Sequence, residues 1–144
     1  MNEDEQISLT AISRRHFDSI IEKNVEAILN SYGDSEDLSV FVEGPRWATH
    51  GFENVAKGWR DFCDSAISLK RCEWVENLFS KTVGEMGIVA GIVELTVEIK
   101  GETKTIRFRG TFVFEQQGAE WKIIHEHFSQ PAEDPYGIGD WLKK

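Results

Sequence analysis

The stretch TKTIRFRGTFVF, residues 103–114, alternates polar and apolar side chains with the two-residue period of a β-strand. One face carries Thr105, Arg107, Arg109, Thr111 and Val113, and the other carries Ile106, Phe108, Phe112 and Phe114. In a strand, successive side chains point to opposite sides. The stretch therefore predicts a long strand with one mixed face and one apolar face.

Further β-rich stretches cover residues 69–80, 88–100 and 121–129, and turns that contain glycine separate the four stretches. Connections this short force neighbouring strands to run antiparallel, because a parallel crossover needs roughly a dozen residues or more. We therefore expect the second half of the chain to form an antiparallel meander.

The first half of the chain has helical spacing. Residues 9–22 repeat apolar side chains near the helical period. Asn24 fits the N-cap of a second, short helix, which is expected to stop at Gly33. A brief apolar strand is expected at 38–42 and a third helix at about 52–66. Helices followed by an antiparallel sheet predict an α+β domain with the helices on one face of the sheet.

Length and charge narrow the class of protein. The 144 residues fit one domain, expected over 1–144 with loose ends at 1–6 and 131–144. The net charge of −9 repels phosphate backbones and anionic lipids, so nucleic acid and membranes are not expected as partners. The first residues lack the basic and apolar segments of a signal peptide, and Cys63 and Cys72 suit a reducing compartment. We expect a cytoplasmic location.

The two faces of the sheet can be used in two ways. Unbroken alternation also places Glu94 and Glu126 on the mixed face. In the first arrangement the apolar face packs on the helices and the charges stay in water. In the second, the sheet curls, the mixed face lines a cavity and a second subunit covers the apolar face. Burying charges is costly unless they are paired, whereas Gly91 and Gly110 favour sharp bends. The patterns alone leave both arrangements open.

The last strand carries a resemblance to a known family. The string WKIIHEHFS at 121–129, followed by Pro131, resembles the final strand of SnoaL-like proteins and of the calcium/calmodulin-dependent protein kinase II association (hub) domain. Both belong to the nuclear-transport-factor-2-like superfamily. The order of a helix pair, a short strand reaching 42–44, a helix with Phe52 and Trp59, and a long meander is similar too, over nearly the whole chain.

This resemblance implies a cone-shaped α+β barrel in which a curled antiparallel sheet wraps around the N-terminal helices and leaves a deep pocket. It also implies a homodimer that packs sheet against sheet, with the mixed face turned inward. The expected pocket residues are Tyr32, Trp47, His50, Trp59, Glu94, Arg107, Arg109, Thr111, Glu126 and Phe128. The expected interface residues are Phe108, Phe112, Trp121, His125 and His127.

The ligand preference of the hub domain is not expected to transfer. Arginines on three long strands line the hub pocket, and the resemblance matches those positions to Glu94, Thr111 and Phe128, none of which is an arginine. Arg109, on the same face as Thr111, is the candidate to replace that charge.

Candidate catalytic groups follow from the same pocket. A carboxylate in an apolar cavity can act as a general acid or base, which suggests Glu94, or alternatively His50, as a base. Arg109 would then orient a carboxylate or enolate of the substrate. The competing interpretation is that the charged residues form internal ion pairs with no catalytic role.

His125 and His127 lie two residues apart on one face, a spacing that can chelate a metal ion. A third ligand is required, and Glu126 points the opposite way, so we expect structural histidines and neither a metal nor a cofactor. Were their face turned inward, His127 would become a candidate base.

The sequence thus predicts a protein with a small-molecule-binding pocket, whose partners are a ligand and a second copy of itself. Two alternatives stay open. One is an isomerase, cyclase or dehydratase that uses proton transfer on a carbonyl substrate, and the other is a hub-like oligomerisation module.

Overall fold

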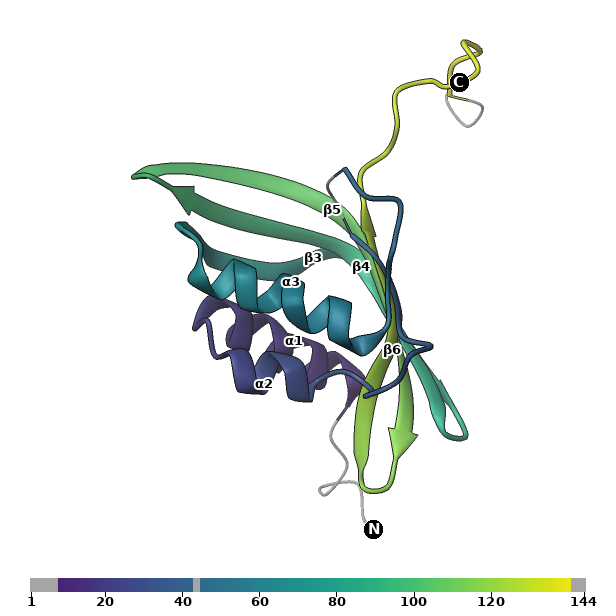
Figure 1. The fold of residues 1–144 in the computed structure, drawn as a ribbon. Helices are drawn as coiled ribbons and strands as arrows, with labels where there is room; N and C mark the ends of the chain where they lie inside the picture. The colour runs from purple at the N-terminus through teal and green to yellow at the C-terminus, as the bar shows by residue number, and fades with distance from the viewer. Residues whose placement is uncertain (1–7, 43–44, 141–144) are drawn as a thin grey trace.

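The computed structural model describes residues 8–42 and 45–140. Three helices lie against one face of a six-stranded sheet, which curls around them and stays open (Figure 1). The helices are α1 (Leu9–Ile21), α2 (Val25–Asn30) and α3 (Phe52–Asp64). The strands are β1 (Ser39–Phe41), β2 (Thr49–His50), β3 (Ile67–Val83), β4 (Met86–Ile99), β5 (Glu102–Gln117) and β6 (Glu120–Ser129). The predicted α+β class and the curled sheet around N-terminal helices are confirmed.

Capping residues set the first two helices. The Ser8 hydroxyl accepts a hydrogen bond from the backbone N–H of Ala11 at 3.1 Å and so caps α1. Asn24 caps α2 as predicted, accepting from the N–H of Ala27 at 3.2 Å. The second helix ends at Asn30, before the expected stop at Gly33, because the Gly33 N–H bonds the carbonyl oxygen of Ile123 in β6 at 2.9 Å.

The strand order is β2-β1-β6-β5-β4-β3, and β3 to β6 form the predicted antiparallel meander. The short strand β1 pairs in parallel with β6, so the sheet is mixed and the expectation of a purely antiparallel sheet is corrected. No short turn joins β1 to β6, and turn length therefore does not constrain their direction. The short strand β2, at Thr49–His50, was not predicted. The turn expected after 42 falls partly on 43–44, outside the described residues.

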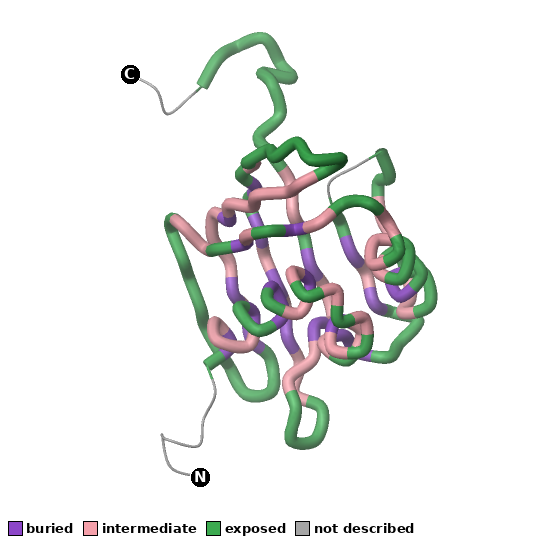
Figure 2. The backbone as a smooth tube through the Cα atoms, turned by 90° about the vertical axis from the view of Figure 1, so that its left-hand side faces the viewer, coloured by how far each residue is buried: buried purple, intermediate pink, exposed green. Residues whose placement is uncertain are grey.

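The apolar face of the sheet packs against the helices. Phe112 and Phe114 of β5 and Val89 and Val93 of β4 are almost completely buried there, at 0–1% exposure. Buried positions accordingly recur along the strands in Figure 2. The mixed face points away from the helices, so the inward orientation implied by the resemblance is wrong. The sheet does curl, but its apolar face packs on the helices, as in the first arrangement. Packing Phe and Val on the helices removes apolar surface from water without burying charges.

A β-bulge interrupts the alternation of β6. Val113 of β5 pairs with His125, but the next residue, Phe114, pairs with Ile123. Ile124 is therefore an extra residue in β6 with no partner of its own in β5. Because of this extra residue, each β6 side chain after Ile124 points to the face opposite to the one that it would occupy in an unbroken strand.

The bulge decides which β6 side chains point inward. Glu126 pairs with Phe112 on the inner face, and Phe128 lies on that face too. His125 and His127 point outward. The expectation that Glu126 shares a face with Glu94 is wrong, because the bulge at Ile124 breaks the alternation on which it rests. Glu126 nevertheless lies inside the fold, and its side chain is 3% exposed.

Because Gly110 of β5 has no side chain, the ring of Phe128 can lie directly against the β5 backbone. A Cβ atom at Gly110 would lie 2.5 Å from Cε1 of Phe128, closer than carbon atoms can approach. Gly110 pairs with Gly91 of β4, where a Cβ would come within 3.2 Å of the β3 backbone at Glu76 and Leu78. Register shifts between β3 and β4 occur in the same region. The two glycines thus allow neighbouring chain segments to approach closely, and the predicted bends at these positions stay a prediction.

Residues 131–140 are exposed and run away from the sheet (Figure 1). Of the helices in the described residues, none has the length and apolar character needed to cross a membrane.

Candidate functional site

A cavity of about 620 Å³ lies between the helices and the inner face of the sheet. Its walls are mostly apolar and include the aromatic side chains of Phe17, Trp59, Phe108, Phe112 and Phe128. Segments distant in sequence supply them: α1, α3, β5 and β6. The cavity is therefore the space that remains where the curled sheet stands off from the helices.

The polar residues of the cavity wall differ in exposure, and Thr49 is half-buried between the two extremes. Arg46, Asn54 and Lys57 line the cavity and are exposed, so they mark its opening. His16 and Glu126 line it too, but their side chains are buried, at 2% and 3% exposure. The opening thus carries two cations and an amide, and the deep end carries an imidazole and a carboxylate.

A hydrogen-bonded cluster at the deep end is centred on the hydroxyl group of Tyr32, which follows α2. Nε1 of Trp59, from α3, donates a hydrogen bond to this oxygen at 3.0 Å. The hydroxyl donates to Oε1 of Glu126, from β6. Nε2 of His16, from α1, lies 3.4 Å from the same oxygen. Three elements and the segment after α2 therefore meet at one buried oxygen atom.

Each cluster residue is placed by a local feature of its element. His16 lies on the buried stripe of α1 with Phe17. Tyr32 forms an isolated parallel bridge with Ile123, which draws the residue after α2 onto the sheet. The bulge in β6 turns Glu126 inward.

Burial controls the protonation of the cluster. Desolvation raises the pKa of Tyr32 well above its ordinary value, and the charge and hydrogen bond of Glu126 raise it further, whereas the hydrogen bond from Trp59 opposes this shift. Tyr32 therefore keeps its proton at neutral pH. Desolvation lowers the pKa of His16 from 6.5 to about 4, so its imidazole is neutral at pH 7. Within the described residues, Nδ1 of His16 is buried without a hydrogen-bond partner.

The predicted base Glu94 lies on the outer face, away from the cavity. Its two carboxylate oxygens accept hydrogen bonds from Arg71 and Arg107, each at 2.8 Å. Hydrogen bonding from Arg107 and then from Arg71 lowers the pKa of Glu94. Arg107 also lies 3.6 Å from Glu76, and Arg71 contacts a further carboxylate, that of Glu73, at 2.7 Å. The placement of Glu94 and Arg107 in the pocket is therefore wrong, and the ion-pair interpretation describes them.

Four other residues that were predicted in the pocket also lie outside the cavity. Arg109 points outward and donates hydrogen bonds to Oγ of Ser129 at 3.2 Å and to the Gln130 carbonyl at 3.3 Å. Thr111 pairs with the outward residue His127. His50 and Trp47 are exposed, Trp47 at 97%, and neither lines the cavity. The pocket placements of Arg109, Thr111, His50 and Trp47 are corrected accordingly.

Three predicted pocket residues do line the cavity: Trp59, Glu126 and Phe128. Tyr32, also predicted, contributes its hydroxyl to the cluster. His16 was missed as a site residue, because its position on the helical stripe is equally typical of a core residue.

Most of the predicted interface residues lie elsewhere. Phe108 and Phe112 line the cavity, and Trp121 packs against the core, so their assignment to the apolar outer surface is wrong. His125 and His127 do lie on the outer face, where both contact the ring of Phe41, with centroids 5.0 Å and 5.5 Å apart. Nδ1 of His125 lies 2.7 Å from the carbonyl oxygen of Ser39. Among residues 8–42 and 45–140, no three His, Cys, Asp or Glu side chains come together as metal ligands.

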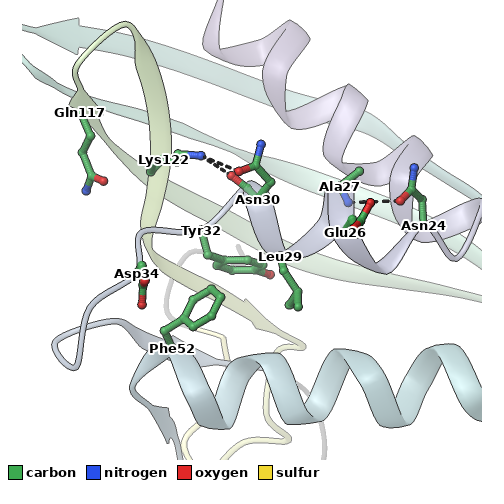
Figure 3. A pocket seen from close by; sticks show the side chains of 10 residues that line it. All are labelled: Asn24, Glu26, Ala27, Leu29, Asn30, Tyr32, Asp34, Phe52, Gln117 and Lys122. Atoms are coloured by element: carbon green, nitrogen blue, oxygen red, sulfur yellow. Dashed lines mark hydrogen bonds between the residues drawn. The ribbon is translucent and has the colours of Figure 1, made fainter.

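A second hollow, a groove of about 750 Å³, lies between α2, the start of α3 and the β5–β6 turn (Figure 3). Its walls include Leu29, Phe52 and the ring of Tyr32, and Nζ of Lys122 bonds Oδ1 of Asn30 at 3.2 Å beside them. The same tyrosine therefore contributes its ring to the groove and its hydroxyl to the cluster at the deep end of the cavity.

Comparison with known proteins identifies the family. Residues 10–133 match the sequence profile of the SnoaL-like domain. The chain belongs to the SnoaL-like family. No curated protein sequence matches this SnoaL-like chain.

Solved structures share the fold of this SnoaL-like domain. A nuclear-transport-factor-2-like protein from Salmonella enterica is 19% identical, with a TM-score of 0.74 over 92% of this chain and 94% of that one. A Xanthomonas campestris protein assigned as a calcium/calmodulin-dependent protein kinase II association domain is 17% identical, with a TM-score of 0.73 over 87% and 86%. A ketosteroid isomerase-like protein from Erwinia carotovora atroseptica is 14% identical, with a TM-score of 0.69 over 92% and 100%. The predicted membership of the nuclear-transport-factor-2-like superfamily is confirmed.

The buried, neutral imidazole of His16 predicts a loss of stability in acid. The unfolded chain binds a proton at His16 below about pH 6.5, whereas the folded protein binds it only near pH 4, so acid favours unfolding. We expect His16 to account for about 3 kcal/mol of the free energy of unfolding lost as the pH falls from 6.5 to 4. Urea unfolding at several pH values measures this loss. In His16→Gln the pH dependence becomes flatter, whereas the exposed control His50→Gln keeps the wild-type slope. Equal slopes for all three proteins contradict the prediction.

Proposed function

We propose that this SnoaL-like protein binds a small, largely apolar molecule in the cavity between its helices and its sheet. The observation that carries the proposal is a cavity of about 620 Å³ with aromatic and aliphatic walls and a buried polar cluster at its deep end. Ligand sites in proteins typically measure about 300–1,000 Å³ and combine apolar walls with a few polar groups that orient the ligand. The cavity fits this description in size and in composition.

The exposed ends of the cavity wall support access for a ligand from solvent. Arg46 and Lys57 lie at the opening, and Ile67 of β3 and Ile99 of β4, which pair with each other, line it nearby. All four residues are exposed. A molecule entering there passes between α3 and the ends of two strands before it reaches the buried cluster.

Filling the cavity is expected to prevent binding. In Val97→Trp, an indole replaces a small side chain on the cavity wall, and we expect the affinity for para-phenylphenol to fall at least about tenfold. Isothermal titration calorimetry measures the affinity. In the control Thr105→Trp the same indole is placed on the outer face of β5, and wild-type affinity is expected. Equal loss of affinity in both variants, or none in either, counts against the cavity as the binding site.

A second candidate function is proton transfer on a carbonyl compound. The observation that favours it is the buried carboxylate of Glu126, in an apolar cavity and next to the Tyr32 hydroxyl. Such a carboxylate can remove a proton from the carbon beside a carbonyl group, and the resulting enolate takes the proton back at a new or the same carbon. The name of the Erwinia relative, ketosteroid isomerase-like, is compatible with this chemistry on a shared fold.

The second candidate predicts exchange of ligand protons with solvent. With para-acetylbiphenyl in deuterium oxide, the wild-type protein should speed deuterium uptake at the acetyl methyl group, followed by nuclear magnetic resonance. Glu126→Gln cannot accept the proton, so the rate should fall at least about 100-fold. Glu98→Gln, the same change on the outer face of β4, should leave the rate unaltered. No acceleration by the wild-type protein leaves binding alone as the function.

The outer face of the sheet is the proposed contact between two copies of the chain. In the described part of the chain no helix covers this face (Figure 1), and Phe41 is 37% exposed there beside His125 and His127. Val113 and Ile92 on the same face add apolar surface between the charged residues. The alternative, a hub-like module, would assemble into more than two copies.

Light scattering tests the dimer. We expect a mass of twice the 16.4 kDa of one chain. Val113→Asp places a charge in the middle of the contact, and its mass should fall to that of one chain. A wild-type monomer contradicts the dimer, and a larger closed assembly supports the hub-like alternative instead.

A further inference from the structure

The hydrogen bonds around Tyr32 fix where each proton of the cluster lies. An indole N–H only donates, so the Trp59 contact at 3.0 Å uses one lone pair of the Tyr32 oxygen. The single hydroxyl proton of Tyr32 is directed to Oε1 of Glu126. Toward any other neighbour, this oxygen can therefore act only as an acceptor.

This count assigns the tautomer of His16. Its imidazole is neutral, so one ring nitrogen carries a proton and the other a lone pair. Nε2 faces the Tyr32 oxygen at 3.4 Å, and because that oxygen has no proton left to offer, Nε2 is the nitrogen that carries the proton. Nδ1 then carries the lone pair. It is the buried atom that lacks a hydrogen-bond partner in the described part of the chain.

The hydrogen-bond donors of the cluster are therefore used within it, and a ligand in the cavity can bond only to its acceptors. The protons of Trp59, Tyr32 and His16 are all directed within the cluster. A carboxylate can accept about four hydrogen bonds, so Glu126 can accept one from a ligand in addition to its contacts within the fold, of which the Tyr32 hydroxyl is one. Outside the cluster, the side-chain donors on the described cavity wall are Arg46, Asn54 and Lys57 at the opening, the half-buried hydroxyl of Thr49, and the thiol of Cys72, which donates only weakly.

We propose that the deep end of the cavity selects ligands that carry a hydrogen-bond donor, a hydroxyl or amine group on an apolar skeleton, and that the carboxylate of Glu126 accepts this bond. The inference rests on the proposed function, that the cavity binds a small molecule. A ligand whose buried polar group is only an acceptor, such as an ether or a ketone, finds no free donor on Trp59, Tyr32 or His16, so the hydrogen bonds that it loses to water are not replaced by this cluster.

The same arrangement weighs against the second candidate function. An enolate oxygen needs a donor to stabilise its charge. At the deep end, Tyr32 would first have to turn its proton from Glu126 toward the substrate, which leaves the carboxylate without that bond. Binding of a donor-bearing ligand requires no such rearrangement.

Three compounds with one skeleton test the inference. Para-phenylphenol donates a hydrogen bond, whereas para-methoxybiphenyl and para-acetylbiphenyl only accept, and all three keep the two aromatic rings. By isothermal titration calorimetry at pH 7, we expect the phenol to bind at least about tenfold more tightly than the ether and the ketone.

Two variants locate the preference in the cluster. Glu126→Gln supplies an amide donor beside an acceptor, so the ratio of phenol to ether affinity should fall toward one. Tyr32→Phe removes the oxygen that Trp59 and His16 bond, which frees two donors, so the ether and the ketone should gain affinity relative to the phenol. Glu98→Gln, on the outer face, should keep the wild-type ratio. Circular dichroism shows which variants fold, and either cluster variant alone suffices.

The outcomes separate this inference from the proposed function. Equal affinities of the wild-type protein for phenol and ether overturn the donor preference but leave the cavity as a binding site. A preference that persists unaltered in the folded cluster variants overturns the role of Glu126. If none of the three compounds binds, the proposed function fails and the inference fails with it.

Discussion

The arrangement of the whole site depends on the register between β5 and β6. Backbone pairing holds the two strands together on both sides of Ile124, and the pairing accommodates this residue only as a bulge. The bulge sets the direction of the β6 side chains that follow Ile124. Glu126 and Phe128 point into the interior, and His125 and His127 point outward. An unbroken strand would have placed imidazoles among the phenylalanines and a carboxylate in water.

Bringing Glu126 into an apolar interior carries a desolvation penalty, and the surroundings show how it is offset. The carboxylate accepts the Tyr32 hydroxyl, whose oxygen is in turn bonded by Trp59. Hydrogen bonds to a charged group contribute roughly 1.5–3 kcal/mol, more than bonds between neutral groups. Because α1, α3, β6 and the segment after α2 all contribute to this cluster, it connects the helices to the sheet across the cavity. The charged pairs of Glu94 with Arg71 and Arg107 avoid the same penalty by staying on the solvent side.

The sequence carried enough local information for the elements and too little for the site. The alternation of 103–114 and the apolar stripe of 9–22 are short-range patterns, and both elements were predicted with nearly correct bounds. The bulge at Ile124 was not predictable, because apolar residues on both sides of it make either register plausible. The parallel pairing of β1 with β6 joins segments that no turn connects. The family resemblance supplied the cone and the pocket, but it also implied that the mixed face points inward. That orientation would bury Glu94 and Arg107, which instead stay on the outer face, whereas Glu126 lies inside because of the bulge.

The absence of a side chain at Gly110 sets the width of the chamber beside Phe128. The ring of Phe128 occupies the volume that a Cβ atom at Gly110 would need. Adding that one carbon atom would therefore displace the ring and change the shape of the space beside it. Relatives with the same backbone could therefore admit molecules of different girth by exchanging one small residue on a central strand, without altering any group that forms hydrogen bonds. Shape and polarity of this chamber are thus governed by separate residues, and each can change while the other is preserved.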